Sequence, residues 1–94
     1  MLEIRLSRRF KKDFKRVSKQ PFFDRELFEF VVGELASGRP LDAKFRDHEL
    51  VGRQSGLTGC RECHIKPDWL LIYKVYEKDL VLYLMETGSH SDLF

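Results

Sequence analysis

The sequence contains no apolar run long enough to cross a membrane. Its longest strongly apolar run, Trp69 to Tyr73, falls far short of the roughly 20 residues that a transmembrane helix needs. The first six residues also lack the basic start and long apolar stretch of a secretory signal. We therefore expect a cytoplasmic protein that makes no membrane contact.

Cysteine is scarce, with only Cys60 and Cys63, which His64 follows directly. This spacing matches the attachment motif for c-type haem, but the neighbouring side chains are charged and no export signal is present. Structural zinc usually requires four ligands, and one cysteine pair supplies too few. A redox-active pair would begin a helix, whereas these residues begin a strand-like run. We predict two reduced cysteines, with Cys63 in the core, and neither a metal nor a cofactor.

The 94 residues are 43% hydrophobic and include eight phenylalanines, which is typical of one globular domain covering residues 1–94. The net charge of +2 does not by itself indicate a nucleic-acid partner. Its distribution says more, because the segment from Arg5 to Lys19 carries eight basic residues and a single acid, Asp13. Such a segment suits a phosphate backbone or an acidic protein. A solvated helix face is the alternative.

The N-terminal half has the pattern of one strand and two helices. Alternation of apolar and polar residues over 2–6 predicts a half-buried strand. Ser7 can cap a helix that ends before Pro21, and its apolar residues recur at helical spacing: Phe10, Phe14 and Val17. Asp24 can cap a second helix, which we expect to run to about Ser37.

The C-terminal half reads as a sheet that follows a long loop or hairpin at residues 41–59. Strands are predicted over 60–66, 69–76 and 80–86, and the short turns between them make these strands antiparallel neighbours. The fold class is therefore α+β: an N-terminal strand, two helices, then an antiparallel sheet of three or more strands. The helices should pack on one face of this sheet.

The chain has only three histidines, His48, His64 and His90. Histidine has an unperturbed pKa of about 6.5 and exchanges protons near neutral pH. The three lie among basic, acidic and aromatic residues, which favours acid–base chemistry on a polyanion. The alternative is that all three are solvated surface side chains.

Four segments carry a resemblance to a known family. They read RRFKKDFKR at 8–16, DHEL at 47–50, RECHIKPDWLLIY at 61–73 and TGSHSDLF at 87–94. Together they resemble the YafQ branch of the RelE/ParE toxin superfamily, in the same order along essentially the whole chain. The resemblance implies the toxin of a type II toxin–antitoxin pair. Such a toxin is an endoribonuclease, or mRNA interferase, that cuts messenger RNA on the ribosome.

The resemblance also implies partners and site residues. The partners are a cognate antitoxin, messenger RNA, the ribosome and, only through the toxin–antitoxin complex, operator DNA. Residues with an implied catalytic role are His48, His64, Asp68 and His90. Candidate substrate-binding residues are Arg61, Lys66, Trp69 and Phe94.

The expected chemistry needs no metal, because RNA carries its own nucleophile in the ribose 2′-hydroxyl. His90 is the preferred general acid, either His64 or Asp68 is the base, and His48 binds phosphate or assists proton transfer. Trp69 and Phe94 would stack on bases, although a tryptophan on an apolar strand more often belongs to the core.

Two features of the sequence complicate this assignment. Strand alternation places His64 on one face with Glu62 and Lys66, so Arg61 reaches the same phosphate only if the strand twists or bulges. Glu86 stands where the family usually has a basic residue, and a carboxylate there would repel phosphate. Glu86 slightly favours a toxin of the same fold that inhibits DNA gyrase, but the three histidines oppose it. A basic nucleic-acid-binding module is the third possibility.

Overall fold

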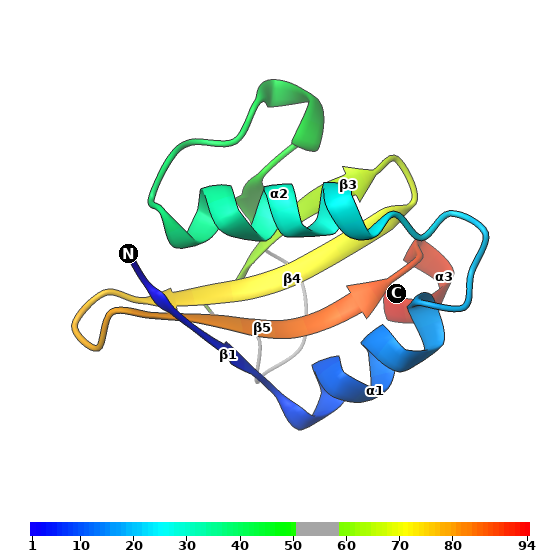
Figure 1. The fold of residues 1–94 in the computed structure, drawn as a ribbon, viewed down its shortest axis with the longest axis horizontal. Coiled ribbons are helices and arrows are strands. Elements are labelled where there is room, and N and C mark those ends of the chain that lie inside the picture. Colours follow the sequence, from blue (N-terminus) through cyan, green and yellow to red (C-terminus); the bar gives the residue numbers. More distant parts are fainter. Residues whose placement is uncertain (51–58) are drawn as a thin grey trace.

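The computed structural model describes residues 1–50 and 59–94, and Figure 1 presents its fold. The strands are β1 (Glu3–Leu6), β2 (His48–Glu49), β3 (Arg61–Lys66), β4 (Trp69–Tyr76) and β5 (Val81–Gly88). The helices are α1 (Arg8–Val17), α2 (Arg25–Ala36), the short 3₁₀ helix η1 (Ala43–Phe45) and α3 (His90–Leu93). The expected strand–helix–helix–sheet order is confirmed. The region predicted as a loop also contains η1 and β2, and its residues 51–58 lie outside the described part of the chain.

The five strands form one sheet in the order β1-β5-β4-β3-β2. The pairs β3–β4 and β4–β5 are antiparallel, as the short turns predicted. The pair β2–β3 is also antiparallel, and β2 was not predicted. Strand β1 instead pairs in parallel with β5, because the chain passes through both helices and three strands before β5 returns beside it. The sheet is therefore mixed rather than purely antiparallel.

Both long helices begin at the predicted caps. The Ser7 Oγ accepts a hydrogen bond of 2.8 Å from the backbone N–H of Phe10, and the Asp24 Oδ1 accepts one of 3.1 Å from that of Leu27. These side chains satisfy backbone donors that the first turn of a helix leaves without partners. Helix α2 was predicted to run to about Ser37, and it ends at Ala36 with Ser37 as its C-terminal cap.

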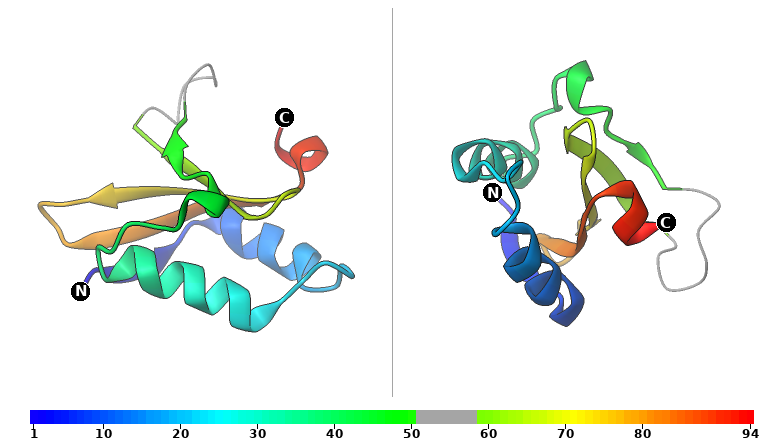
Figure 2. Two further views of the ribbon diagram at one scale, coloured as in Figure 1. Left: turned by 90° about the horizontal axis from the view of Figure 1, so that it is seen from above. Right: turned by 90° about the vertical axis from the view of Figure 1, so that its right-hand side faces the viewer.

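The two faces of the sheet carry different elements, as the left view of Figure 2 shows. Helices α1 and α2 cover one face, which we call the helix face, and their phenylalanines pack there with Trp69, Leu71 and Leu84. The opposite face, here the site face, carries α3. A smaller apolar cluster lies on it: Cys60, Leu70, Ile72 and Leu93, with Leu50 and Met85 packed against them.

A buried carboxylate ties α1 to the end of β5. Asp13 is 1% exposed, and its Oδ2 accepts a hydrogen bond of 3.2 Å from the backbone N–H of Thr87. Its Oδ1 accepts bonds from Arg9 Nε at 3.1 Å and from Arg16 Nη1 at 3.3 Å. These partners compensate the cost of burying the charge. The network fixes the strand end from which α3 continues.

Neither cysteine forms a disulfide, and Cys63 lies in the core, as predicted; Cys60 is buried as well. Burial raises the pKa of the Cys63 thiol well above its ordinary value, which keeps it in the unreactive protonated form. Within the described residues, no helix is long and apolar enough to span a membrane.

Candidate active site

The three histidines, which lie far apart in the sequence, come together on the site face. The ring centroids of His48 and His64 are 6.2 Å apart, and those of His64 and His90 are 5.5 Å apart. Three elements supply them: β2, β3 and the first residue of α3. The alternative that all three are solvated surface side chains fails for His64, which is buried.

Glu62 joins this cluster, although sequence reasoning gave it no role. It pairs with His48 across β2 and β3, and it lies two residues before His64 on the same face of β3. Its Oε1 is 3.3 Å from His48 Nε2 and 3.6 Å from His64 Nε2. The side chain is only 6% exposed. Its position two residues before His64 in a predicted strand indicated that both lie on one face. Its contact with His48 could be recognised only once the pairing of β2 with β3 was known.

Backbone carbonyls orient two of the rings. His48 Nδ1 lies 2.7 Å from the carbonyl oxygen of Arg46, and His64 Nδ1 lies 3.2 Å from that of Pro67. A carbonyl oxygen only accepts hydrogen bonds, so each Nδ1 carries the hydrogen and donates it. In the neutral ring, Nε2 then holds the free lone pair, and in both rings this atom faces Glu62.

Asp68 holds His90 rather than standing apart as an independent base. Its Oδ1 accepts 2.9 Å hydrogen bonds from both the backbone N–H and the ring Nδ1 of His90. These bonds, the backbone one foremost, lower the pKa of the Asp68 carboxyl. Because Asp68 occupies Nδ1, the His90 Nε2 is left for proton transfer. This geometry favours His64 over Asp68 as the base.

Helix α3 is held in place from three sides. Ser89 and Asp92 form a reciprocal capping box, with Ser89 N–H donating to Asp92 Oδ2 at 3.0 Å and Asp92 N–H donating to Ser89 Oγ at 3.2 Å. Arg16 Nη2 from α1 lies 3.6 Å from Asp92 Oδ2, and Leu93 packs into the site-face apolar cluster. A Cβ at Gly88 would come within 2.9 Å of the Asp92 Cβ, so only glycine fits this close approach.

Acidification should release α3 from the sheet. Hydrogen bonds lower the folded pKa of Asp68 and, through the Ser89 backbone N–H first, that of Asp92, both from an ordinary value of 3.8. A lowered carboxyl pKa stabilises the folded arrangement above the unfolded pKa, and this contribution disappears as the pH falls through the folded value. We expect α3 to stay docked at neutral and mildly acidic pH and to detach below about pH 4.

Amide chemical shifts of residues 89–94, followed by NMR as the pH is lowered, would test this expectation. The amide of Leu71, in the middle of β4, serves as a control for global unfolding. Simultaneous loss of both signals would contradict a local release.

Three predicted substrate-binding residues have their partners outside the histidine cluster. Arg61 pairs across the sheet with Tyr73 of the helix-face core, and its guanidinium binds Asp47 with nitrogen–oxygen distances of 3.3 and 3.4 Å.

Lys66 was predicted to share the face of His64, and this is wrong. A shift in register between His64 and Lys66 turns the lysine to the helix face, where its Nζ donates to the Phe22 carbonyl at 2.8 Å.

Trp69 belongs to the core. It is 0% exposed, and its ring centroid lies 5.5–6.2 Å from those of Phe22, Phe23 and Phe28. Its Nε1 donates a 3.0 Å hydrogen bond to Thr87 Oγ1. No surface of this ring is open to a base, so the stacking role expected from the resemblance does not fit. Phe94 does fit, since it is 57% exposed and its ring centroid lies 6.2 Å from that of His90.

Glu86 does not present an unpaired charge to the site. The side chain is largely buried, and Arg9 Nη2 from α1 lies 3.8 Å from its Oε1. This guanidinium offsets the carboxylate charge. The repulsion of phosphate that the sequence suggested is therefore reduced by a residue from another element.

The mixed sheet, the basic first helix and the histidine cluster occur here in a chain that matches a class of bacterial toxins. A family model described as "Bacterial toxin of type II toxin-antitoxin system, YafQ" matches residues 2–94. The chain belongs to this YafQ toxin family, which confirms the resemblance drawn from its motifs.

Individual relatives agree with this assignment. The mRNA interferase toxin YafQ of Escherichia coli (strain B / BL21-DE3) is 36% identical over 92 residues, which cover 98% of this chain and 95% of the relative. A metal-bound toxin from Helicobacter pylori is 46% identical, with a TM-score of 0.88 and full coverage of both chains. YafQ in the E. coli DinJ–YafQ complex is 33% identical, with a TM-score of 0.82, over 100% of this chain and 99% of that one.

Proposed function

We propose that this toxin is an mRNA interferase, an endoribonuclease that cleaves messenger RNA bound to the ribosome in the cytoplasm. The observation that carries the proposal is the gathering of His48, His64 and His90 on one face, with Glu62 and Asp68 hydrogen-bonded or close to them. Relatives that share its full length are named mRNA interferase toxins. The retained histidines weigh against the gyrase-inhibiting alternative.

The proposed reaction begins at the ribose 2′-hydroxyl. His64, oriented by Pro67 and backed by Glu62, takes the hydroxyl proton at Nε2 while the 2′ oxygen attacks the adjacent phosphorus. His90 donates a proton to the departing 5′ oxygen as the phosphorus–oxygen bond breaks. The products are a 2′,3′-cyclic phosphate and a 5′-hydroxyl end. Each acid or base typically contributes about 10²–10⁴-fold in rate.

His48 and Phe94 lie on either side of the two proposed catalytic histidines, and we assign both to substrate binding. His48 in its protonated form would hold a phosphate oxygen, since its ring is half exposed at the edge of the site. Phe94 would stack on a base beside the scissile linkage, a contact worth about 1–3 kcal/mol. Arg61 and Lys66 act through packing and hydrogen bonds on the helix face.

The test of the reaction class is to express the chain from a tightly regulated promoter and to map RNA ends in the cell. The proposal expects new 5′-hydroxyl ends in translated messages, and co-expression of the neighbouring gene product, if it is the antitoxin, should abolish them. Growth arrest with intact messages and damaged DNA would favour gyrase inhibition instead.

The basic face of α1 provides a binding surface next to the site. Lys12, Lys15, Arg16 and Lys19 line a surface hollow of about 360 Å³, and Arg16 also contacts Asp92 of α3. The hollow therefore adjoins the helix that carries His90. We propose that this surface follows the RNA backbone as it leaves the site.

Replacement of Lys12, Lys15 and Lys19 by glutamine should weaken RNA binding and flatten its salt dependence. Each phosphate contact to a single strand contributes about 0.7 to the slope of log K against log salt, so the slope should fall by about two. Fluorescence anisotropy of a labelled RNA at several salt concentrations measures this, with Lys78→Gln in the β4–β5 turn as the control. An unchanged slope would mean that this helix face is merely solvated or serves an acidic protein.

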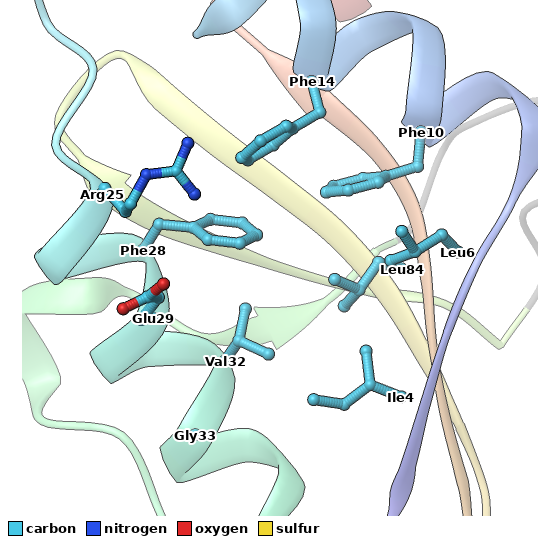
Figure 3. Close-up of a pocket in the computed structure, with 10 residues that line it drawn as sticks. All are labelled: Ile4, Leu6, Phe10, Phe14, Arg25, Phe28, Glu29, Val32, Gly33 and Leu84. Atoms are coloured by element: carbon cyan, nitrogen blue, oxygen red, sulfur yellow. The ribbon is translucent and has the colours of Figure 1, made fainter.

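We further propose that the antitoxin covers an apolar groove between α1, α2 and β1 (Figure 3). The groove has a volume of about 420 Å³, and most of its lining is apolar, with Arg25 and Glu29 beside Phe10, Phe14, Phe28, Ile4, Leu6 and Leu84. Ile4 and Leu6 are exposed, which is unusual for side chains of this size in a contiguous patch. Because α1 is basic beside the groove, the fitting partner is an amphipathic segment with acidic flanks.

A further inference from the structure

Three donor atoms converge at one point on the site face: Nε2 of His48, Nε2 of His64 and a carboxylate oxygen of Glu62. All three lie within 4.8 Å of one another, and the two nitrogens are 3.3 and 3.6 Å from Glu62 Oε1. Since both Nδ1 atoms donate to backbone carbonyls, each neutral ring turns a lone pair toward the carboxylate. Three lone pairs facing one another repel unless a cation lies between them.

Glu62 gives a second, independent sign that a positive group belongs here. Its side chain is 6% exposed, and among the described residues its Oε2 has no hydrogen-bond partner. A buried carboxylate oxygen without a donor is costly, so the site favours a bound cation.

The donor set suits a transition-metal ion. Zinc binds imidazole nitrogen and carboxylate oxygen at about 2.0–2.2 Å, so its tetrahedral ligands lie about 3.4 Å apart. The two contacts to Glu62 are close to that separation. Metal-bound histidines usually donate their other ring N–H to a backbone carbonyl or carboxylate, and His48 and His64 already do so. His48 is half exposed, so an ion can reach the three donor atoms from solvent.

We propose that His48, Glu62 and His64 form a binding site for a single Zn²⁺ or Cu²⁺ ion, and that occupancy of this site blocks RNA cleavage. The block rests on the proposed function, in which Nε2 of His64 takes the proton of the 2′-hydroxyl. An ion that uses this lone pair removes the base. The metal is then a reversible inhibitor and not a cofactor, and Cu²⁺ binds more tightly than Zn²⁺.

Binding is tested on the purified, metal-free chain by calorimetric titration with ZnCl₂ and, separately, with CuCl₂. We expect saturation at one ion per chain and nitrogen hyperfine structure in the electron paramagnetic resonance spectrum of the Cu²⁺ form. His48→Gln and Glu62→Gln should each weaken binding by about 100-fold or more. Glu49→Gln is the matched control, since Glu49 adjoins His48 but pairs with Arg61 on the other side of β2. Both cysteines are buried and do not compete.

Inhibition is tested by measuring RNA cleavage as Zn²⁺ is added. Cleavage should fall along the binding curve and return when EDTA is added. No saturable binding, or equal affinity in wild type, His48→Gln and Glu62→Gln, would overturn the site. Full cleavage by the saturated protein would overturn the block. If the metal-free chain cleaves no RNA, the proposed function fails, while selective loss of binding in the two variants would still uphold the metal site.

Discussion

Replacement of His90 by alanine should lower the rate constant of RNA cleavage by about 10²–10⁴-fold, the usual contribution of a general acid. The ring is more than half exposed, and its hydrogen bond goes to Asp68, which is still more exposed. We therefore expect almost no change in the free energy of unfolding. Single-turnover cleavage of a defined RNA, together with urea denaturation, measures the two effects separately.

Two further variants sharpen this test. His64→Ala should cause a loss of at least about a hundredfold, and Ser91→Ala, beside His90 in the same helix, should cleave RNA normally. Asp68→Asn should lower the rate less than His90→Ala, because the amide oxygen can still accept the ring hydrogen bond. Near-complete cleavage by both histidine variants would reject the assignment of these residues.

Trp69→Ala should destabilise the fold by about 3–5 kcal/mol, the usual range for deletion of a buried tryptophan or phenylalanine ring. The ring has no exposed surface, packs among three phenylalanines and binds Thr87. For a domain of this size, such a loss is a large fraction of the total stability. Urea denaturation followed by circular dichroism measures it without depending on the single tryptophan.

Trp69→Phe separates packing from RNA contact. It keeps most of the ring and loses the hydrogen bond to Thr87, so we expect a cost of about 0.5–1.5 kcal/mol. The affinity for RNA should stay at the wild-type value. A variant of normal stability with weakened RNA binding would instead restore the stacking role that the family resemblance suggested.

Much of the fold was predictable because it depends on local signals. Ser7 and Asp24 mark the starts of both long helices, and short turns at 67–68 and 77–80 fix the antiparallel order of β3, β4 and β5. The parallel pairing of β1 with β5 was not predictable in this way. It joins residues more than 75 positions apart and is decided by packing of the whole chain.

The site was predictable in its residue types but not in its partners. The histidines and Asp68 stood out in the sequence, whereas the contact of Glu62 with His48 depends on the register of β2, which is only two residues long. The expected face of Lys66 was wrong because one irregular step in β3 ends the simple alternation. The Arg9–Glu86 pair likewise joins a helix to a distant strand.

The residues that stabilise the fold and the residues that we propose to cleave RNA lie mostly on opposite faces of the sheet. Most of the core packing lies under α1 and α2, while the histidines that we propose to transfer protons lie on the opposite face of the sheet. If the proposed roles hold, a single substitution such as His90→Ala should abolish cleavage and leave the protein folded. Such a harmless copy would still present the groove of Figure 3, and it would draw antitoxin away from active copies in the same cell.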